Sequence, residues 1–332
     1  MTGERPERVL VLRALGLGDL LTAVPALHAL RRAFPDHRLT LAAPAALADA
    51  AAATGVVDEL LPAEEAGRGV PRAIPWRGPP PRLAVDLHGC GPLSVEPLRT
   101  LRPRRLIGYA RPPGPAWRAW EHERDRWCRL LGWHGMPADP SRVGIAAPRT
   151  PSPAPGAVVL HPGAEAGARR WPAERFAAVA EALAPRRVVV TAGSGEEPLA
   201  RRVAALAGLP AGAVLTGLSF DRLSALIAGA AAVLVGDTGV AHLATAHGTP
   251  SVVLFGPVSP RLWGPPRLPR HRALWCPGPE RGPRVGDPHG ARPDPRLLRI
   301  GPRQAVAALE YVLAAADPAQ PTPGQPTPGQ PT

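Results

Sequence analysis

The chain has 332 residues, of which 45% are hydrophobic and 4% aromatic, and this predicts a soluble globular protein with more than one hydrophobic core. Its formal net charge of +12 would suit a nucleic acid, an anionic membrane or a phosphorylated substrate. Lysine and asparagine are absent and every cationic residue other than histidine is arginine, as a GC-rich genome would produce, so the charge alone identifies no partner.

The N-terminal half alternates short aliphatic runs with helical patterns. Arg13, Asp19, Pro25 and His28 interrupt the first apolar run, which therefore predicts a strand, a turn and a helix, not a signal peptide or a membrane span. Strands alternating with helices indicate a parallel sheet with helices on both faces. We expect strands at 8–14, 39–44, 58–63, 83–89 and 104–110, and helices at about 19–33 and 45–53.

A proline-rich segment, residues 149–156, has the composition of a domain linker. Beyond it the alternation restarts, which predicts a second α/β domain. There we expect strands at 157–163, 187–193, 213–217, 231–237 and 251–257, and helices at 174–184, 198–206, 221–228 and after Asp237. The sequence thus predicts two doubly wound domains, 1–148 and 157–300, a C-terminal helix at 301–316, and a disordered proline repeat at 317–332.

Three cysteines, Cys90, Cys128 and Cys276, are widely separated and form no C-x-x-C pair. They predict neither a disulfide framework nor a zinc site, and they favour a reducing cytoplasm.

In open parallel sheets, ligands bind beyond the carboxyl ends of the strands, where loops lead into helices. The first such loop, "RALGLGDLL", places Gly16 and Gly18 at an expected tight turn just before Asp19. It lacks the third glycine of the dinucleotide fingerprint, which disfavours a nicotinamide enzyme. Asp19 is either a helix-capping residue or a general base for a substrate hydroxyl.

The second loop, "HPGAEAGARRWPAERF", begins at His161 and carries Arg169 and Arg170 at the start of the next helix. Two adjacent arginines in this position suit a diphosphate. A solvated pair of charges explains this loop equally well.

Two further loops carry acidic residues at helix starts. In "TAGSGEEPLARR", Glu196 and Glu197 either favour the helix start or accept the hydroxyls of a ribose. In "VGDTGVAHLATAHGTP", the backbone N–H groups after Asp237 can hold phosphate oxygens, and the Asp237 carboxylate can reach sugar hydroxyls.

Taken together, these loops resemble one family in order and spacing. The stretches "GLGDLLTAVPALHALRRAFP", "LHPGAEAGARRWPAERFAAVAEAL", "AGSGEEPLARRVA" and "GDTGVAHLATAHGTPSVVLFGP" are similar to glycosyltransferase family 9, the ADP-heptose:lipopolysaccharide heptosyltransferases and their relatives. The resemblance implies the GT-B architecture, in which two Rossmann-like domains face a cleft. It also implies that the N-terminal domain takes the acceptor and the C-terminal domain the sugar nucleotide.

The resemblance further assigns roles to individual residues. It implies a catalytic base at Asp19, a diphosphate-binding residue at Arg169 where the family has lysine, and a nucleotide-ribose ligand at Glu196. The family's phosphate and donor-sugar contacts fall on Asp237, Thr238 and Gly239, with His242 nearby, and Gly16, Gly18 and His161 fall at the turns of the cleft.

These roles imply an inverting glycosyltransferase that needs no metal ion and no cofactor besides its nucleotide diphosphate sugar, for which ADP-heptose is one candidate. Arg169 and the helix start would stabilise the leaving diphosphate. Two alternatives stay open: a nucleotide-sugar-binding protein without catalysis, and a nucleotide-sugar epimerase of GT-B architecture. A nucleic-acid partner is not expected, because the sequence shows neither stacking aromatics nor a recognition helix.

The acceptor is expected to be a glycan or a glycolipid of the cell envelope, handled in the cytoplasm. His88 is assigned to the acceptor side, as are Arg102, Arg104 and Arg105 of the arginine-rich stretch 99–118. Two interpretations of this stretch stay open, a solvated loop or a face that meets an anionic acceptor at the inner membrane surface, beside Trp117 and Trp120.

Overall fold

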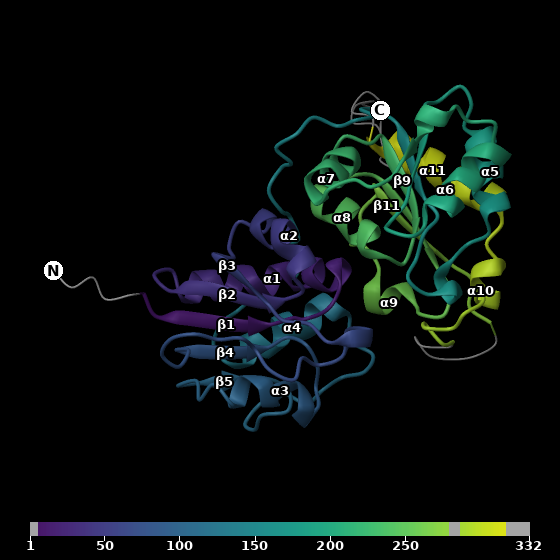
Figure 1. Cartoon of the computed structure of the whole chain (residues 1–332). Helices are drawn as coiled ribbons and strands as arrows, with labels where there is room; N and C mark the ends of the chain where they lie inside the picture. Colours follow the sequence, from purple (N-terminus) through teal and green to yellow (C-terminus); the bar gives the residue numbers. More distant parts are fainter. Residues whose placement is uncertain (1–5, 279–285, 317–332) are drawn as a thin grey trace, which may run out of the picture.

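The computed structural model describes residues 6–278 and 286–316, which form two lobes, each built on one parallel sheet (Figure 1). The N-terminal sheet has the strand order β3-β2-β1-β4-β5, and every pair is parallel. Leu10 of the central strand pairs with Thr40 on one side and with Ala84 on the other. The strands are β1 (Arg8–Leu12), β2 (Arg38–Ala43), β3 (Glu59–Pro62), β4 (Leu83–Asp86) and β5 (Leu106–Ile107).

Four α-helices connect or cover this first sheet. They are α1 (Leu17–Ala33), α2 (Ala48–Ala53), α3 (Pro92–Arg99) and α4 (Glu123–Trp133), with short 3-10 turns at Ala45–Leu47 and Ala66–Arg68. Because both faces of the central strands are covered, β1 is almost wholly apolar and buried.

The C-terminal sheet has six parallel strands in the order β11-β10-β9-β6-β7-β8. They are β6 (Val158–His161), β7 (Val188–Thr191), β8 (Val214–Leu215), β9 (Ala232–Gly236), β10 (Ser251–Phe255) and β11 (His271–Trp275). The helices of this lobe are α5 (Ala173–Ala182), α6 (Glu197–Leu206), α7 (Phe220–Ala228), α8 (Gly239–His247), α9 (Pro260–Trp263), α10 (Pro295–Leu298) and α11 (Pro302–Ala316), with 3-10 turns at Gly167–Arg169 and Ala211–Ala213.

Two doubly wound α/β lobes confirm the predicted fold class, while several local predictions were wrong. The strand expected at 104–110 is only two residues long, and the helix expected at 45–53 begins as a 3-10 turn. The expected order lacked α3, α4, α9, α10 and β11. The proline repeat predicted to be disordered lies outside the described residues.

Helix α1 lies between the two lobes and packs against both. Its Leu27 belongs to the core of the N-terminal lobe, whereas Leu21 and Val24 share a core with Leu243 of α8. The N-terminal ends of α1 and α8 meet, because a Cβ on Gly239 would lie 3.1 Å from the Leu17 Cβ. This crossing brings the first turns of two helices, one from each lobe, to one place.

Both sheets reverse their winding beside this crossing. In the first sheet the chain moves outward from β1 through β2 to β3 and then returns to β4, on the other side of β1. In the second it moves from β6 through β7 to β8 and then returns to β9. Open α/β sheets bind ligands at such switch points, so we expect a ligand site beyond the carboxyl ends of β1 and β4 and of β6 and β9.

None of the helices in the described part of the chain is both long enough and apolar enough to cross a membrane.

Candidate active site

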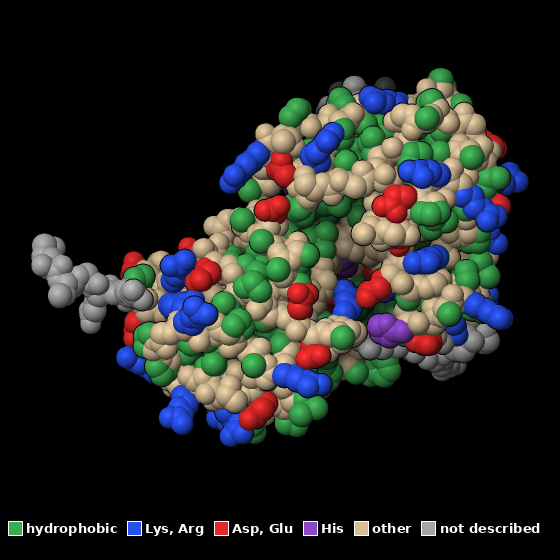
Figure 2. Space-filling model, in the orientation of Figure 1, with side chains coloured by type: hydrophobic (Ala, Val, Ile, Leu, Met, Phe, Trp, Pro, Cys, Tyr) green, Lys and Arg blue, Asp and Glu red, His purple; other side chains and the backbone are tan. Residues whose placement is uncertain are grey.

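A cavity of about 210 Å³ lies between the lobes at the two switch points. Figure 2 shows the hollow, with acidic, basic and histidine side chains gathered along it. The N-terminal lobe contributes Gly18, Asp19 and Arg68, and the C-terminal lobe contributes Arg169, Asp237, Thr238, Gly239, His242, Val258, Trp263, Pro288 and His289.

A second cavity continues from the first into the C-terminal lobe. The two share Arg68, Arg169, Thr238 and Gly239 as lining residues, and the second extends to His161, Gly193 and Glu196. One elongated ligand could therefore run from Asp19, past Arg169, to Glu196.

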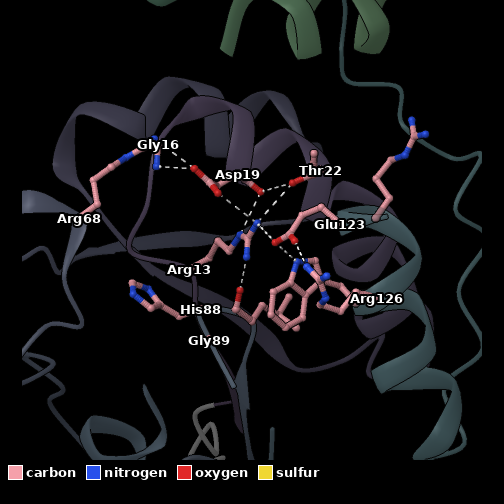
Figure 3. Close-up of polar contacts among 12 residues, drawn as sticks. Arg13, Gly16, Asp19, Thr22, Arg68, His88, Gly89, Glu123 and Arg126 are labelled. Carbon is pink, nitrogen blue, oxygen red and sulfur yellow. Dashed lines mark hydrogen bonds and ion pairs between the residues drawn. The ribbon is translucent and has the colours of Figure 1, made fainter. Parts of the chain in front are cut away.

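Asp19 lies in the first turn of α1 and its side chain is 14% exposed. Its Oδ2 accepts a hydrogen bond from the Gly16 N–H at 3.1 Å and also lies 3.2 Å from Nη2 of Arg68 (Figure 3). Its Oδ1 lies 3.5 Å from Nη2 of the buried Arg13. The carboxylate thus stabilises the helix start and faces the cavity at the same time.

The expected reason for Gly16 and Gly18, a tight turn, was wrong. Gly16 has extended backbone angles that any residue adopts, and neither glycine has a positive φ. The structure shows close approach instead: a Cβ on Gly16 would overlap the Arg68 guanidinium, and one on Gly18 would lie 2.8 Å from Cδ2 of His242. These glycines make room for side chains of the cleft.

The adjacent arginines of the second loop point to different places. Arg169 lines both cavities, its side chain is 16% exposed, and its Nη1 donates to the Asp237 carbonyl at 3.1 Å. Arg170 is 44% exposed; its Nε donates to the Ala164 carbonyl and its Nη2 lies 3.6 Å from Glu196. Only Arg169 offers its charge to the centre of the cleft.

The start of α8 forms the floor of the cleft. Thr238 is its N-cap residue, and the Thr238 Oγ1 is buried without a hydrogen-bond partner among the described residues. The first N–H groups of a helix point outward and favour an anion. Burial raises the pKa of the neighbouring Asp237 to about 6; the Arg169 charge opposes this rise and the Asp19 charge adds to it.

Glu196 and His161 lie at the inner end of the second cavity. Glu196 is the N-cap residue of α6, and its Oε2 accepts from the Gly193 N–H at 3.1 Å. A Cβ on Gly163 would overlap this carboxylate, which therefore lies directly over the loop after β6. Burial lowers the pKa of His161 to about 4, so its ring is neutral at pH 7.

His242 and Trp263 form one wall of the first cavity. Their rings meet edge to face, with centroids 5.9 Å apart. Burial lowers the pKa of His242 to about 3, and the Arg124 charge contributes to this lowering. A neutral imidazole beside an indole is a partly apolar surface with hydrogen-bonding capacity, which suits a sugar.

Only one of the four residues assigned to the acceptor side lies near Asp19. His88 follows β4 and lies in the same cluster as Arg13 (Figure 3), and burial lowers its pKa to about 4. Arg102, Arg104 and Arg105 are not brought to the cleft: they lie between the end of α3 and the start of β5, at the amino edge of the sheet. Arg104 pairs there with Glu7 at 2.8 Å, just before β1.

Three charged residues of the site were missed. Arg13 directly follows β1, Glu123 begins α4, and Arg68 follows Gly67 in the loop after β3. Arg13 gave a usable signal, because a charged residue directly follows a buried apolar strand. Arg68 gave none: it reaches Asp19 and also lies 3.0 Å from Glu165, across the cleft, only because of the tertiary structure.

Among residues 6–278 and 286–316, no group of three or more His, Cys, Asp or Glu side chains is placed to hold a metal ion.

Comparisons with known proteins agree with this geometry. Residues 142–281 match the model of "Glycosyltransferase family 9 (heptosyltransferase)". This segment, which spans less than half of the chain, is similar to glycosyltransferase family 9. It includes Arg169, Glu196 and the start of α8, whereas Asp19, Pro288 and His289 of the cavity lining lie outside it.

The relatives agree with that assignment. Lipopolysaccharide heptosyltransferase 1 of Pseudomonas aeruginosa is 37% identical over 112 residues, which cover 33% of this chain and 31% of that protein. The chain thus spans about a third of the length of this curated relative.

Two solved structures match nearly the whole chain. A glycosyltransferase family 9 protein from Veillonella parvula has a TM-score of 0.72 at 20% identity, covering 93% of this chain and 98% of that one. ADP-heptose lipopolysaccharide heptosyltransferase II of E. coli has a TM-score of 0.67 at 17% identity, covering 92% and 98%. The two lobes therefore have the GT-B fold of the family 9 enzymes.

Proposed function

We propose that this protein is an inverting glycosyltransferase that moves a sugar from a nucleotide diphosphate sugar to an acceptor hydroxyl without a metal ion. One observation carries the proposal: a single cavity is lined by Asp19 from the N-terminal lobe and by Arg169 and the α8 N-terminus from the C-terminal lobe. A carboxylate facing a cation and a helix start is what deprotonation of a hydroxyl and departure of a diphosphate require.

The two cavities suggest how the donor lies. The nucleoside would occupy the second cavity, with its ribose hydroxyls on Glu196, and the diphosphate would lie between Arg169 and the N–H groups at the start of α8. The sugar would then lie in the first cavity against His242 and Trp263. The unpartnered Thr238 Oγ1 would donate to a phosphate oxygen.

In the reaction, Asp19 accepts the proton of the acceptor hydroxyl while the oxygen of that hydroxyl forms a bond to the anomeric carbon. The bond from that carbon to the diphosphate oxygen breaks, and the electron pair leaves with the diphosphate. Arg169 and the helix start stabilise the negative charge that grows there. Because attack and departure occur on opposite faces, the anomeric configuration inverts.

The names of the relatives support a proposal for the donor class. The E. coli structure is named for ADP-heptose and the Pseudomonas relative for lipopolysaccharide, so we propose ADP-heptose, or a similar sugar nucleotide, and a cell-envelope glycan or glycolipid. Because sugar nucleotides are cytoplasmic metabolites, we place the reaction on the cytoplasmic side of the envelope. A lipid-linked acceptor would bring the protein to the inner membrane surface as a peripheral contact.

The test is a transfer assay with ADP-heptose and a deacylated lipopolysaccharide-core acceptor, read by mass spectrometry and by NMR of the new anomeric proton. The proposal predicts release of ADP and an acceptor heavier by one heptose, with inverted configuration. A new sugar nucleotide formed from the donor without acceptor would identify an epimerase. Tight donor binding without turnover of any sugar nucleotide in a panel would identify a binding protein.

A further inference from the structure

Arg13 is a buried cation that the proposed reaction does not use directly. It directly follows the last residue of β1, is 1% exposed and lines neither cavity. A guanidinium removed from water is costly unless its hydrogen bonds and its charge are matched. Its partners therefore indicate what it does.

Every nitrogen of the Arg13 guanidinium has a partner, and two of the partner atoms belong to Asp19 (Figure 3). Nε donates to the Asp19 carbonyl at 3.0 Å, and Nη2 lies 3.5 Å from the Asp19 Oδ1. Nη1 donates to the Leu87 carbonyl, just after β4. The side chain thus ties the first turn of α1 to the β1/β4 switch point and places its charge beneath the Asp19 carboxylate.

Glu123 balances this charge from the other side. Its Oε1 accepts from Nη2 of Arg13 at 2.9 Å and from Nε1 of Trp127 at 2.9 Å, while its Oε2 pairs with Arg126. Glu123 and Arg126 are both buried. Two arginines, Glu123 and Asp19 therefore form a neutral set, in which the charge of Arg13 is shared between two carboxylates.

We infer that Arg13 is a positioning residue for Asp19, and that Glu123 sets how strongly the Arg13 charge acts on the Asp19 carboxylate. The inference rests on the proposed function, in which Asp19 accepts the proton. Arg68 also contacts Asp19 but is 37% exposed and belongs to a loop, so its contact is open to exchange with a substrate. Arg13 is enclosed and holds Asp19 throughout the reaction.

Other groups face Asp19 or share its cavity, and all are unchanged in the variants proposed below. They are Arg68 of the loop after β3, His88 of the loop after β4, Arg169 of the loop after β6, Asp237 of the loop after β9 and His242 of α8.

Two variants that change the charge near Asp19 in opposite directions test the inference. Arg13→Met removes the cation while keeping a stem of similar length, and Glu123→Gln removes the anion that balances it. We expect the Asp19 carboxyl to titrate at higher pH in Arg13→Met and at lower pH in Glu123→Gln, because a nearby cation favours the carboxylate. The acid limb of the kcat profile should move in the same directions.

Arg13→Lys keeps the positive charge but lacks the planar guanidinium and its several N–H donors. It should leave the titration near that of the wild type and restore part of the kcat lost in Arg13→Met, and donor Kd should stay constant throughout. Leu130→Ala is the matched control, since Leu130 is buried in α4 but belongs to the apolar core. It should lower the melting temperature without moving the titration.

The titration is followed by ¹³C NMR of protein labelled at the aspartate carboxyl, with Asp19→Asn to assign the signal, so it needs no turnover. Opposite shifts in Arg13→Met and Glu123→Gln support the inference. Unchanged titration in both variants, or loss of kcat explained by stability alone as in Leu130→Ala, overturns it. Opposite shifts in a protein that transfers no sugar would refute the proposed function and leave the link between Arg13 and Asp19 standing.

Discussion

Arg169→Ala removes the one side chain that the two cavities share and that carries a charge from the C-terminal lobe. Its guanidinium is mostly enclosed and is held by the Asp237 carbonyl at 3.1 Å, so it meets the diphosphate partly desolvated and already oriented. A hydrogen bond to a charged group contributes about 1.5–3 kcal/mol. Since about 1.4 kcal/mol is a factor of ten, donor Kd should weaken roughly tenfold to a hundredfold.

Arg170→Ala is the matched control, because it removes the same kind of side chain from the neighbouring position. Arg170 is more exposed and is already bound to the Ala164 carbonyl and near Glu196. We expect donor Kd to change by less than about threefold, which corresponds to the small effect of an exposed ion pair.

Isothermal titration calorimetry with ADP and with ADP-heptose measures both variants, and thermal melts confirm that they are folded. Arg169→Lys should recover part of the donor affinity, since it keeps the positive charge but lacks the planar guanidinium. A larger loss in Arg170→Ala than in Arg169→Ala would refute the assignment of the diphosphate to the centre of the cleft.

Three further predictions concern the cleft and its surroundings. Burial raises the pKa of Asp237, so the folded protein binds this proton more tightly than the unfolded chain, and the free energy of unfolding should fall as pH rises from about 4 to about 6. In urea melts, Asp237→Asn should show a smaller fall over this range. The same pH dependence in Asp237→Asn and the wild type would contradict the burial argument. Gly18→Ala places a Cβ 2.8 Å from Cδ2 of His242, which should lower the free energy of unfolding by about 1–3 kcal/mol and weaken donor binding. An unchanged melting temperature would show that the two helix starts can separate freely. The triple variant Arg102→Gln, Arg104→Gln, Arg105→Gln should keep its transfer rate with a soluble acceptor to within about twofold, because these residues lie at the opposite edge of the sheet; a large loss would return them to the acceptor side.

The two-lobed fold could be predicted because apolar strands and amphipathic helices alternate along the whole chain. Elements without this pattern could not: α4 carries alternating charges and tryptophans, and β11 begins "HR" at the edge of its sheet. Their apolar faces are evident only against the neighbours that cover them.

Asp19, Arg169, Glu196 and Asp237 were candidates because each follows a strand at a helix start, where the topology places ligand contacts. Their individual roles came from the resemblance to glycosyltransferase family 9. Arg68 and Glu123 lie far from Asp19 in the sequence, and no local pattern reports their contacts. The sequence also could not show that Arg102, Arg104 and Arg105 lie away from the cavity. Helix α3 runs back along the sheet and leaves its C-terminal end at the edge away from the cleft.

The central claim is that Asp19 accepts the proton of the acceptor hydroxyl, and Asp19→Asn tests it most directly. The amide keeps the shape of the side chain but cannot act as a base, so kcat for transfer from ADP-heptose should fall about a hundredfold or more. Donor Kd, measured by calorimetry on the same preparation, should stay near the wild-type value, because Arg169 and the α8 start are unchanged. Turnover close to that of the wild type would contradict the account and leave Asp19 as a helix-capping residue.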